Sequence, residues 1–144
     1  MTEKDNNYFI DTNIIMYAAG SEHEYKDHCL KILKNIDSFD LNYFINTETI
    51  QEILYRYSYI NLKKFGIDLA LDTIELFDTI LQISVKDLHQ AIDLLKKYNF
   101  LISRDALIIA NMVNNGLKKI ISADKVFDRI EEITRIDPKN YDIS

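Results

Sequence analysis

The chain has 144 residues, of which 47% are hydrophobic, so we expect a single domain over residues 1–144 rather than two. Its net charge of −6 argues against a broad basic face for nucleic acid, because phosphate contacts require clustered lysine and arginine. That argument weakens if several of the 23 acidic residues converge on divalent cations, which present positive charge to a phosphate.

The first half of the chain twice repeats a strand followed by a helix. An apolar run at 8–10 predicts a strand, and the polar residues 11–13 cap a helix that continues to Ala19. Apolar residues at spacings of three or four predict a helix over 23–36. A second apolar run at 43–45 predicts another strand. It ends at Asn46 and Thr47, which are good helix caps, and helical spacing then continues to Tyr57.

The middle of the chain predicts a long helix, a short strand and another helix. Helical spacing of apolar residues extends over 62–81. The next segment, 82–85, alternates like a strand. Ser84 and Asp87 have the spacing of a helix N-cap, and apolar residues then mark a helix that reaches Leu95.

The last third completes the alternation. Ser103 begins a helix whose apolar run continues to Val113, and Asn115-Gly116 provides a C-cap signal. The segment 119–122 is a predicted strand, a short helix follows Asp124, and 133–136 predicts an edge strand. Strands that alternate with helices throughout predict an α/β fold with a mainly parallel sheet of about five strands, covered on both faces.

This arrangement places four acidic residues at one edge of the sheet. Asp11 and Asp124 follow the ends of strands. Glu52 and Asp105 lie in the first turns of helices that begin at the same edge. Groups at the carboxyl ends of parallel strands collect along one edge, so the four carboxylates are predicted to converge.

Carboxylates in one cleft repel each other unless cations neutralise them. Mg²⁺ and Mn²⁺ prefer oxygen ligands, and two such ions about 4 Å apart can activate a water and stabilise a leaving oxygen in phosphodiester cleavage. The sequence offers no competing chemistry, because His23, His28 and His89 lack partner spacing and one cysteine makes no thiolate site. The cluster therefore predicts metal-assisted phosphoryl chemistry.

Four stretches, taken in order, resemble the motifs of the PIN-domain family, and in particular the small prokaryotic PIN proteins that include the VapC-type ribonuclease toxins. The stretches are Phe9-Ile10-Asp11-Thr12-Asn13, residues 48–54 around Glu52, Ser103-Arg104-Asp105-Ala106, and Ile120-Ile121-Ser122-Ala123-Asp124 with Phe127 three residues on. The closing Arg135-Ile136-Asp137-Pro138 is also similar to the family.

The resemblance implies a three-layer α/β/α sandwich and a Mg²⁺- or Mn²⁺-dependent endoribonuclease. The implied metal ligands and catalytic acids are Asp11, Glu52, Asp105 and Asp124, with Asn13 and Ser122 as neighbours that orient a ligand or water. Many family members pair with an antitoxin and form homodimers. Many also carry a further acid directly before the phenylalanine of the last motif. This chain has Val126 there, so the sequence does not decide between one metal ion and two.

Each of these acids also has a structural explanation. Asp11 can cap the first helix, Glu52 can complete a capping box with Thr49, Asp105 can interact with a helix dipole, and Asp124 can form a turn. Four such coincidences at one sheet edge are improbable, which favours function.

Other polar and aromatic residues near these acids are ambiguous. Arg104, Lys125 and Arg129 fit solvated surface charge better than phosphate binding. Tyr55 and Tyr59 are candidates for stacking on bases, whereas Tyr57 fits the core stripe of its helix.

Two other functions remain open. One is a PIN-fold RNA-binding or regulatory module without turnover, which the acid missing at Val126 and the shortage of basic residues motivate. The other is a small-molecule phosphatase that forms an aspartyl-phosphate at Asp11, although such enzymes would want a second aspartate at the position of Asn13.

The sequence predicts a cytoplasmic protein without a membrane segment. The polar start of the chain lacks the basic head and apolar stretch of a secretory signal, and apolar runs such as 106–110 are much shorter than the roughly 18 residues of a membrane helix. The single cysteine, Cys29, suits a reducing compartment, and we expect it to be buried on a helix.

Overall fold

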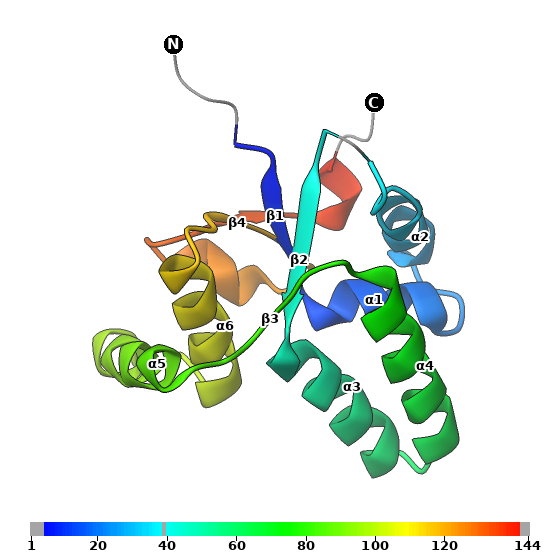
Figure 1. Cartoon of the computed structure of the whole chain (residues 1–144), viewed down its shortest axis with the longest axis horizontal. Helices are drawn as coiled ribbons and strands as arrows, with labels where there is room; N and C mark the ends of the chain where they lie inside the picture. Colours follow the sequence, from blue (N-terminus) through cyan, green and yellow to red (C-terminus); the bar gives the residue numbers. More distant parts are fainter. Residues whose placement is uncertain (1–4, 39, 142–144) are drawn as a thin grey trace.

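The computed structural model describes residues 5–38 and 40–141, and its centre is a five-stranded sheet (Figure 1). The strand order is β3-β2-β1-β4-β5, and every neighbouring pair is parallel. The strands are β1 (Asn7–Ile10), β2 (Asn42–Asn46), β3 (Ile80–Leu81), β4 (Lys119–Ile121) and β5 (Thr134–Ile136). The predicted α/β class and the five parallel strands are therefore confirmed.

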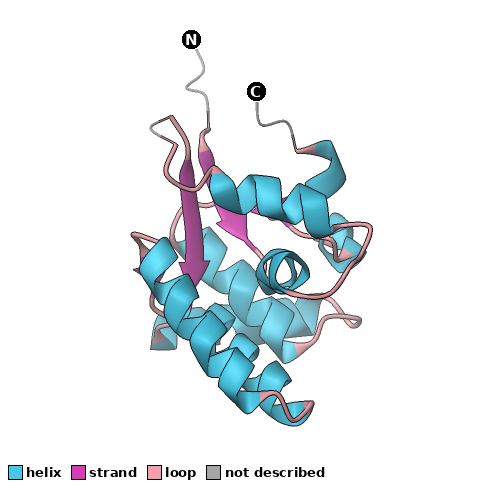
Figure 2. Cartoon of the chain, turned by 90° about the vertical axis from the view of Figure 1, so that its right-hand side faces the viewer, coloured by secondary structure: helices cyan, strands magenta, loops and turns pink. Residues whose placement is uncertain are grey.

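In the described part of the chain, six α-helices cover the two faces of this sheet (Figures 1 and 2). They are α1 (Thr12–Ala19), α2 (Lys26–Lys34), α3 (Thr47–Tyr59), α4 (Lys63–Leu76), α5 (Val85–Lys97) and α6 (Ser103–Asn114), and two short 3₁₀ helices, η1 (Lys125–Arg129) and η2 (Pro138–Asn140), flank β5. Side chains alternate along the strands: Phe9 and Ile120 pack with α5 and α6, whereas Ile10 and Ile121 pack with the helices from α1 to α4.

The strand order reverses between β1 and β4, and this reversal places the candidate site. From the central strand β1 the chain moves outward through β2 and β3, and it then crosses over to β4 and β5. In parallel sheets, ligands bind outside the carboxyl ends of the strands at such a reversal. Asp11 follows β1 and Ser122 follows β4, and the Asp11 backbone N–H donates to the Ile121 carbonyl at 3.1 Å.

The structure corrects the element boundaries predicted for the middle of the chain. The predicted helix over 62–81 ends at Leu76, because Phe77 adopts an extended conformation and buries its ring. The predicted strand at 82–85 is also wrong, since the strand is Ile80–Leu81. Ser84 instead forms a reciprocal capping box with Asp87, so that Val85 begins a helix.

The structure also tests the predictions about single residues and about a membrane segment. Cys29 is buried on α2, as predicted. Helix α2 begins at Lys26, so His23 lies outside it, where its ring stacks on Tyr17 with 4.4 Å between the centroids. Tyr57 is 6% exposed in the core, whereas Tyr55 and Tyr59 are exposed. Within the described ranges, we find no helix with the length and apolar character needed to cross a membrane.

Candidate active site

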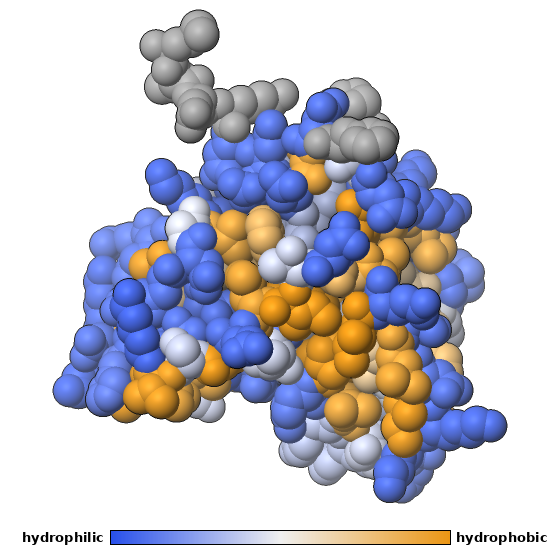
Figure 3. All heavy atoms as spheres, viewed as in Figure 1, coloured by the Kyte–Doolittle hydropathy of each residue, from blue (hydrophilic) through white to orange (hydrophobic). Residues whose placement is uncertain are grey.

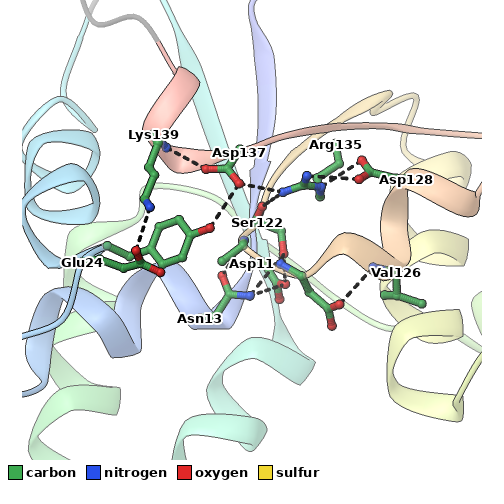
Figure 4. Close-up of polar contacts among 12 residues, drawn as sticks. Asp11, Asn13, Glu24, Ser122, Val126, Asp128, Arg135, Asp137 and Lys139 are labelled. Carbon is green, nitrogen blue, oxygen red and sulfur yellow. Dashed lines mark hydrogen bonds and ion pairs between the residues drawn. The ribbon is translucent and has the colours of Figure 1, made fainter.

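Asp11 is held at the sheet edge by hydrogen bonds to both carboxylate oxygens. The residue is 7% exposed and caps α1, with the backbone N–H of Thr12 donating to Oδ1 at 2.8 Å. On Oδ2 it accepts from the Ser122 hydroxyl at 2.6 Å and from the Asn13 amide at 3.2 Å (Figure 4). Asn13 and Ser122 therefore both contact Asp11, and a role in orienting a ligand or water remains a prediction for them.

The Ser122 hydroxyl also connects Asp11 to Asp124. It accepts a hydrogen bond from the backbone N–H of Asp124 at 3.0 Å, while Asp124 caps η1 by accepting from the Val126 N–H at 3.0 Å. Asp124 is partly exposed, unlike Asp11. One hydroxyl thus contacts the carboxylate of Asp11 and the backbone of Asp124.

Arg135 supports this part of the site, although its sequence motif indicated no role for it. Its Nη1 donates to the Ser122 carbonyl at 2.9 Å and to Asp137 at 3.2 Å, while Nε and Nη2 donate to the two oxygens of Asp128 (Figure 4). Three partners fix an arginine side chain that is only 10% exposed. Arg135 therefore holds the backbone that carries the Ser122 hydroxyl.

Glu52 and Asp105 lie on two different helices and are joined by one arginine. Glu52 on α3 is 6% exposed and Asp105 in the first turn of α6 is 4% exposed. Arg104 Nη1 donates to Glu52 Oε1 at 2.8 Å, and its Nε and Nη2 donate to Asp105 Oδ1 at 3.3 and 3.2 Å. Arg56 is a second cation near Glu52, with Nε at 3.6 Å from Oε1.

The predicted capping box between Thr49 and Glu52 is wrong. Asn46 is the cap of α3, and Thr49 is its reciprocal partner at the third helical position. The box therefore uses the residue that precedes Thr47, because the helix begins three residues earlier than a Thr49 cap requires. Glu52 is left free of capping and faces Arg104 instead.

Three of the four predicted acids line one small cavity of about 60 Å³. Asp11, Glu52 and Asp124 contribute to its wall together with Asn13, Met16, Arg56 and Arg104. Asp105 is not part of this wall and is connected to it through Arg104. Sequence reasoning missed Arg56, although its position one helical turn after Glu52 places both on the same face of α3.

Burial and the nearness of other acids change the pKa values of Asp11 and Asp105. Burial raises the pKa of Asp11 to about 7; the Ser122 hydrogen bond opposes this rise, and the charges of Glu52 and Asp105 add to it. Burial also raises the pKa of Asp105, against the ion pair with Arg104 and with a contribution from Asp124. The carboxylates of Glu52 and Asp105 keep the pKa of Arg104 above its ordinary value despite partial burial.

The chemistry of these groups suits a hard divalent cation, since the acids offer oxygen atoms and their repulsion is relieved by added positive charge. Among the side chains that the structure describes, no three His, Cys, Asp or Glu residues form a group arranged to hold a metal ion. Arg104 occupies the space between Glu52 and Asp105. The assignment of the four acids as metal ligands therefore remains a prediction.

Comparison with known proteins decides the family. The family model described as the PIN domain matches residues 8–133. The chain belongs to the PIN-domain family. Over 128 residues, 88% of this chain and 97% of each relative, it is 34% identical to VapC ribonuclease Mb1869c of Mycobacterium bovis and to Ribonuclease VapC13 of Mycobacterium tuberculosis. The predicted resemblance to VapC-type PIN proteins is confirmed.

Solved structures confirm the PIN-like fold of this domain. The structure resembles VapBC2 from Rickettsia felis, bound to a DNA fragment from its promoter, with a TM-score of 0.71 and 19% identity over 90% of this chain and 97% of that one. It also resembles VapC20 of Mycobacterium tuberculosis, a Sarcin-Ricin loop cleaving toxin, with a TM-score of 0.72 and 12% identity over 88% of this chain and 96% of that one.

Proposed function

We propose that this PIN domain is a divalent-metal-dependent endoribonuclease and the toxin of a toxin–antitoxin pair. The observation that carries the proposal is the cavity where Asp11, Glu52 and Asp124 meet at the reversal of strand order, with Asp105 connected through Arg104. The family and the VapC ribonucleases with similar sequences support RNA as the substrate.

A Mg²⁺ or Mn²⁺ ion on these acids would activate a water and stabilise charge on the cleaved phosphodiester. The protein's own groups position the acids. Ser122 and Asn13 hold Asp11 from one side, and the capping bond of Asp124 orients its carboxylate. A carboxylate at the cavity can accept the proton that water loses during the attack.

An antitoxin is the proposed protein partner, and VapBC complexes among the structural neighbours support it. An apolar groove of about 200 Å³ between α1, α2 and α4 suits a partner segment. Its lining includes Ile15, Leu30, Leu33, Leu69 and Leu76.

The proposal also includes a homodimer and a cytoplasmic location. Hydrophobic side chains gather over α4 and at one end of α5 (Figure 3), and those of α5, Val85, Leu88 and Ile92, are at least 47% exposed. Exposed apolar patches of this kind favour association with another protein surface. A chain with one cysteine suits a reducing compartment.

Cleavage of an RNA pool with Mn²⁺ or Mg²⁺ tests the enzymatic part. Asp11→Asn and Asp105→Asn should each lower the cleavage rate by at least about 100-fold, because each removes a charged ligand from the metal site. Asp93→Asn on the exposed face of α5 is the matched control and should cut as the parent does. Equal cleavage by all variants contradicts the nuclease.

Two further measurements test the alternative and the toxin role. Calorimetric titration with Mn²⁺ in the presence of RNA would favour a non-catalytic module if metal binds and no product forms. Expression of the chain alone should arrest growth, and co-expression of the neighbouring gene should relieve the arrest. Harmless expression of an active nuclease contradicts the toxin role.

A further inference from the structure

Arg104 makes an unusual set of contacts for a residue beside a candidate metal site. Three of its N–H-bearing nitrogens face two carboxylates that come from different helices, Glu52 on α3 and Asp105 on α6. The guanidinium therefore connects α3 to α6 at the edge of the cavity. Its side chain is 31% exposed, so solvent reaches it and it has room to move.

The two carboxylates require a cation even when no metal is bound. Glu52 and Asp105 are 8% and 6% exposed at their side chains. Buried carboxylates that share a site and lack a counter-ion are strongly unfavourable. Arg104 supplies the positive charge in this structure, at hydrogen-bonding distance from both. Arg56 is a weaker partner, because its contact with Glu52 is 3.6 Å long and its side chain is 53% exposed.

The position of Arg104 also conflicts with metal binding. Its Nη1 donates to Glu52 Oε1, and its Nε and Nη2 donate to Asp105 Oδ1. Arg104 also lines the cavity, whose volume of about 60 Å³ holds only a few waters and leaves little room for an ion with its ligands beside the guanidinium. A divalent ion that binds both carboxylates therefore competes with Arg104 for their negative charge.

We propose that Arg104 is a built-in counter-ion that competes with the divalent metal for Glu52 and Asp105. In the metal-free protein it holds α3 and α6 together at the site, and metal binding releases it from both carboxylates. The inference rests on the proposed function, since it takes these two acids as metal ligands. Its consequence is that Arg104 weakens metal binding and stabilises the metal-free fold.

Titration of the metal alone separates this role from that of an ordinary surface charge. Mn²⁺ is titrated calorimetrically into the full chain, into Arg104→Gln and into the control Lys96→Gln, which removes an exposed positive charge on α5 that does not line the cavity. Arg104→Gln should bind Mn²⁺ about tenfold more tightly and should melt at a lower temperature in EDTA, because two buried carboxylates lose their partner. Lys96→Gln should change the Kd by less than about twofold.

A second substitution covers the case in which Arg104→Gln does not fold. Arg104→Lys keeps one positive charge but cannot reach two carboxylates with a planar fork, so its Kd for Mn²⁺ should be tighter than that of the parent. An unchanged or weaker Kd in the folded variants overturns the proposal. Weaker RNA binding with an unchanged Kd for Mn²⁺ also overturns it, since Arg104 would then contact RNA only.

The parent chain distinguishes this failure from failure of the proposed function. If the parent binds Mn²⁺ but cuts no RNA, the nuclease proposal fails. The comparison of Kd values then still tests whether Arg104 competes with the metal. If neither the parent nor the variants bind Mn²⁺, both proposals fail together.

Discussion

Two buried aspartates in this protein accept similar numbers of hydrogen bonds, but their pKa values are shifted in opposite directions. Asp11 is 7% exposed and Asp87 is 2% exposed. Asp87 accepts from the Ser84 backbone N–H at 2.9 Å and from the side-chain amides of Asn111 and Asn114 at 3.0 and 2.7 Å. Burial would raise the pKa of Asp87, but these hydrogen bonds outweigh it and lower the pKa, whereas the pKa of Asp11 is about 7.

Burial and neighbouring charge together distinguish the two sites. Burial is the main cause of the raised pKa of Asp11, and the negative charges of Glu52 and Asp105 add to it, whereas hydrogen bonds outweigh burial at Asp87. Asn111 also accepts from the Asn46 amide at 3.1 Å, so the Asp87 network joins α5, α6 and the cap of α3. A buried carboxylate that is satisfied by neutral donors is structural, and one with acidic neighbours still requires a cation.

The largest expected difference between the sites is in stability after the same substitution. Asp87→Asn should lower the free energy of unfolding by about 3 kcal/mol, because its new amide group faces donors that lose their acceptor. Asp11→Asn should leave stability unchanged or raise it, because it removes a buried charge from a crowded site. Urea denaturation of both variants in EDTA at neutral pH measures this. Equal losses in the two variants contradict the comparison.

The two aspartates should make stability depend on pH in opposite directions. The size of this effect should be smaller than the loss of stability in Asp87→Asn. The pKa of Asp11 is raised to about 7, so its contribution is present below about pH 4 and is lost as the pH rises towards 7. We expect a loss on the order of 2 kcal/mol in EDTA, because the coupled acids share protons. The lowered pKa of Asp87 means that its contribution is present above about pH 4 and is lost at more acidic pH.

Denaturation curves of the parent, Asp11→Asn and Asp87→Asn between about pH 3 and 8 check these signs. The advantage of Asp11→Asn over the parent should grow towards pH 7, and the deficit of Asp87→Asn should shrink in acid. A parent curve that parallels Asp11→Asn over the whole range would show that Asp11 titrates normally.

The smallest effect concerns one partner from each site. Asn114→Ala should cost about 1 kcal/mol, because it removes a short hydrogen bond to a buried carboxylate. Arg56→Gln should cost less than about 0.5 kcal/mol, because the ion pair with Glu52 is long and half-exposed. Thermal denaturation of the two variants under identical conditions compares their losses of stability. A larger loss for Arg56→Gln than for Asn114→Ala would contradict the assignment of Arg104 as the main counter-ion of Glu52.

The amino-acid sequence by itself determined the local features of this protein. Apolar periodicity predicted four of the five strands, and the caps at Asp11 and Ser84 were visible because a cap and its helix are neighbours in the chain. The boundaries between 62 and 85 were predicted wrongly, since the apolar spacing of α4 continues beyond Leu76 and only the buried position of Phe77 ends the helix.

Tertiary structure alone decided which polar groups meet. Ser122 reaches Asp11 across 111 residues because β1 and β4 are neighbours in the sheet. Arg104 reaches Glu52 because α3 and α6 both begin at the edge where strand order reverses. Such contacts depend on the order of the strands in space, and the spacing of residues along one strand or helix carries no information about that order.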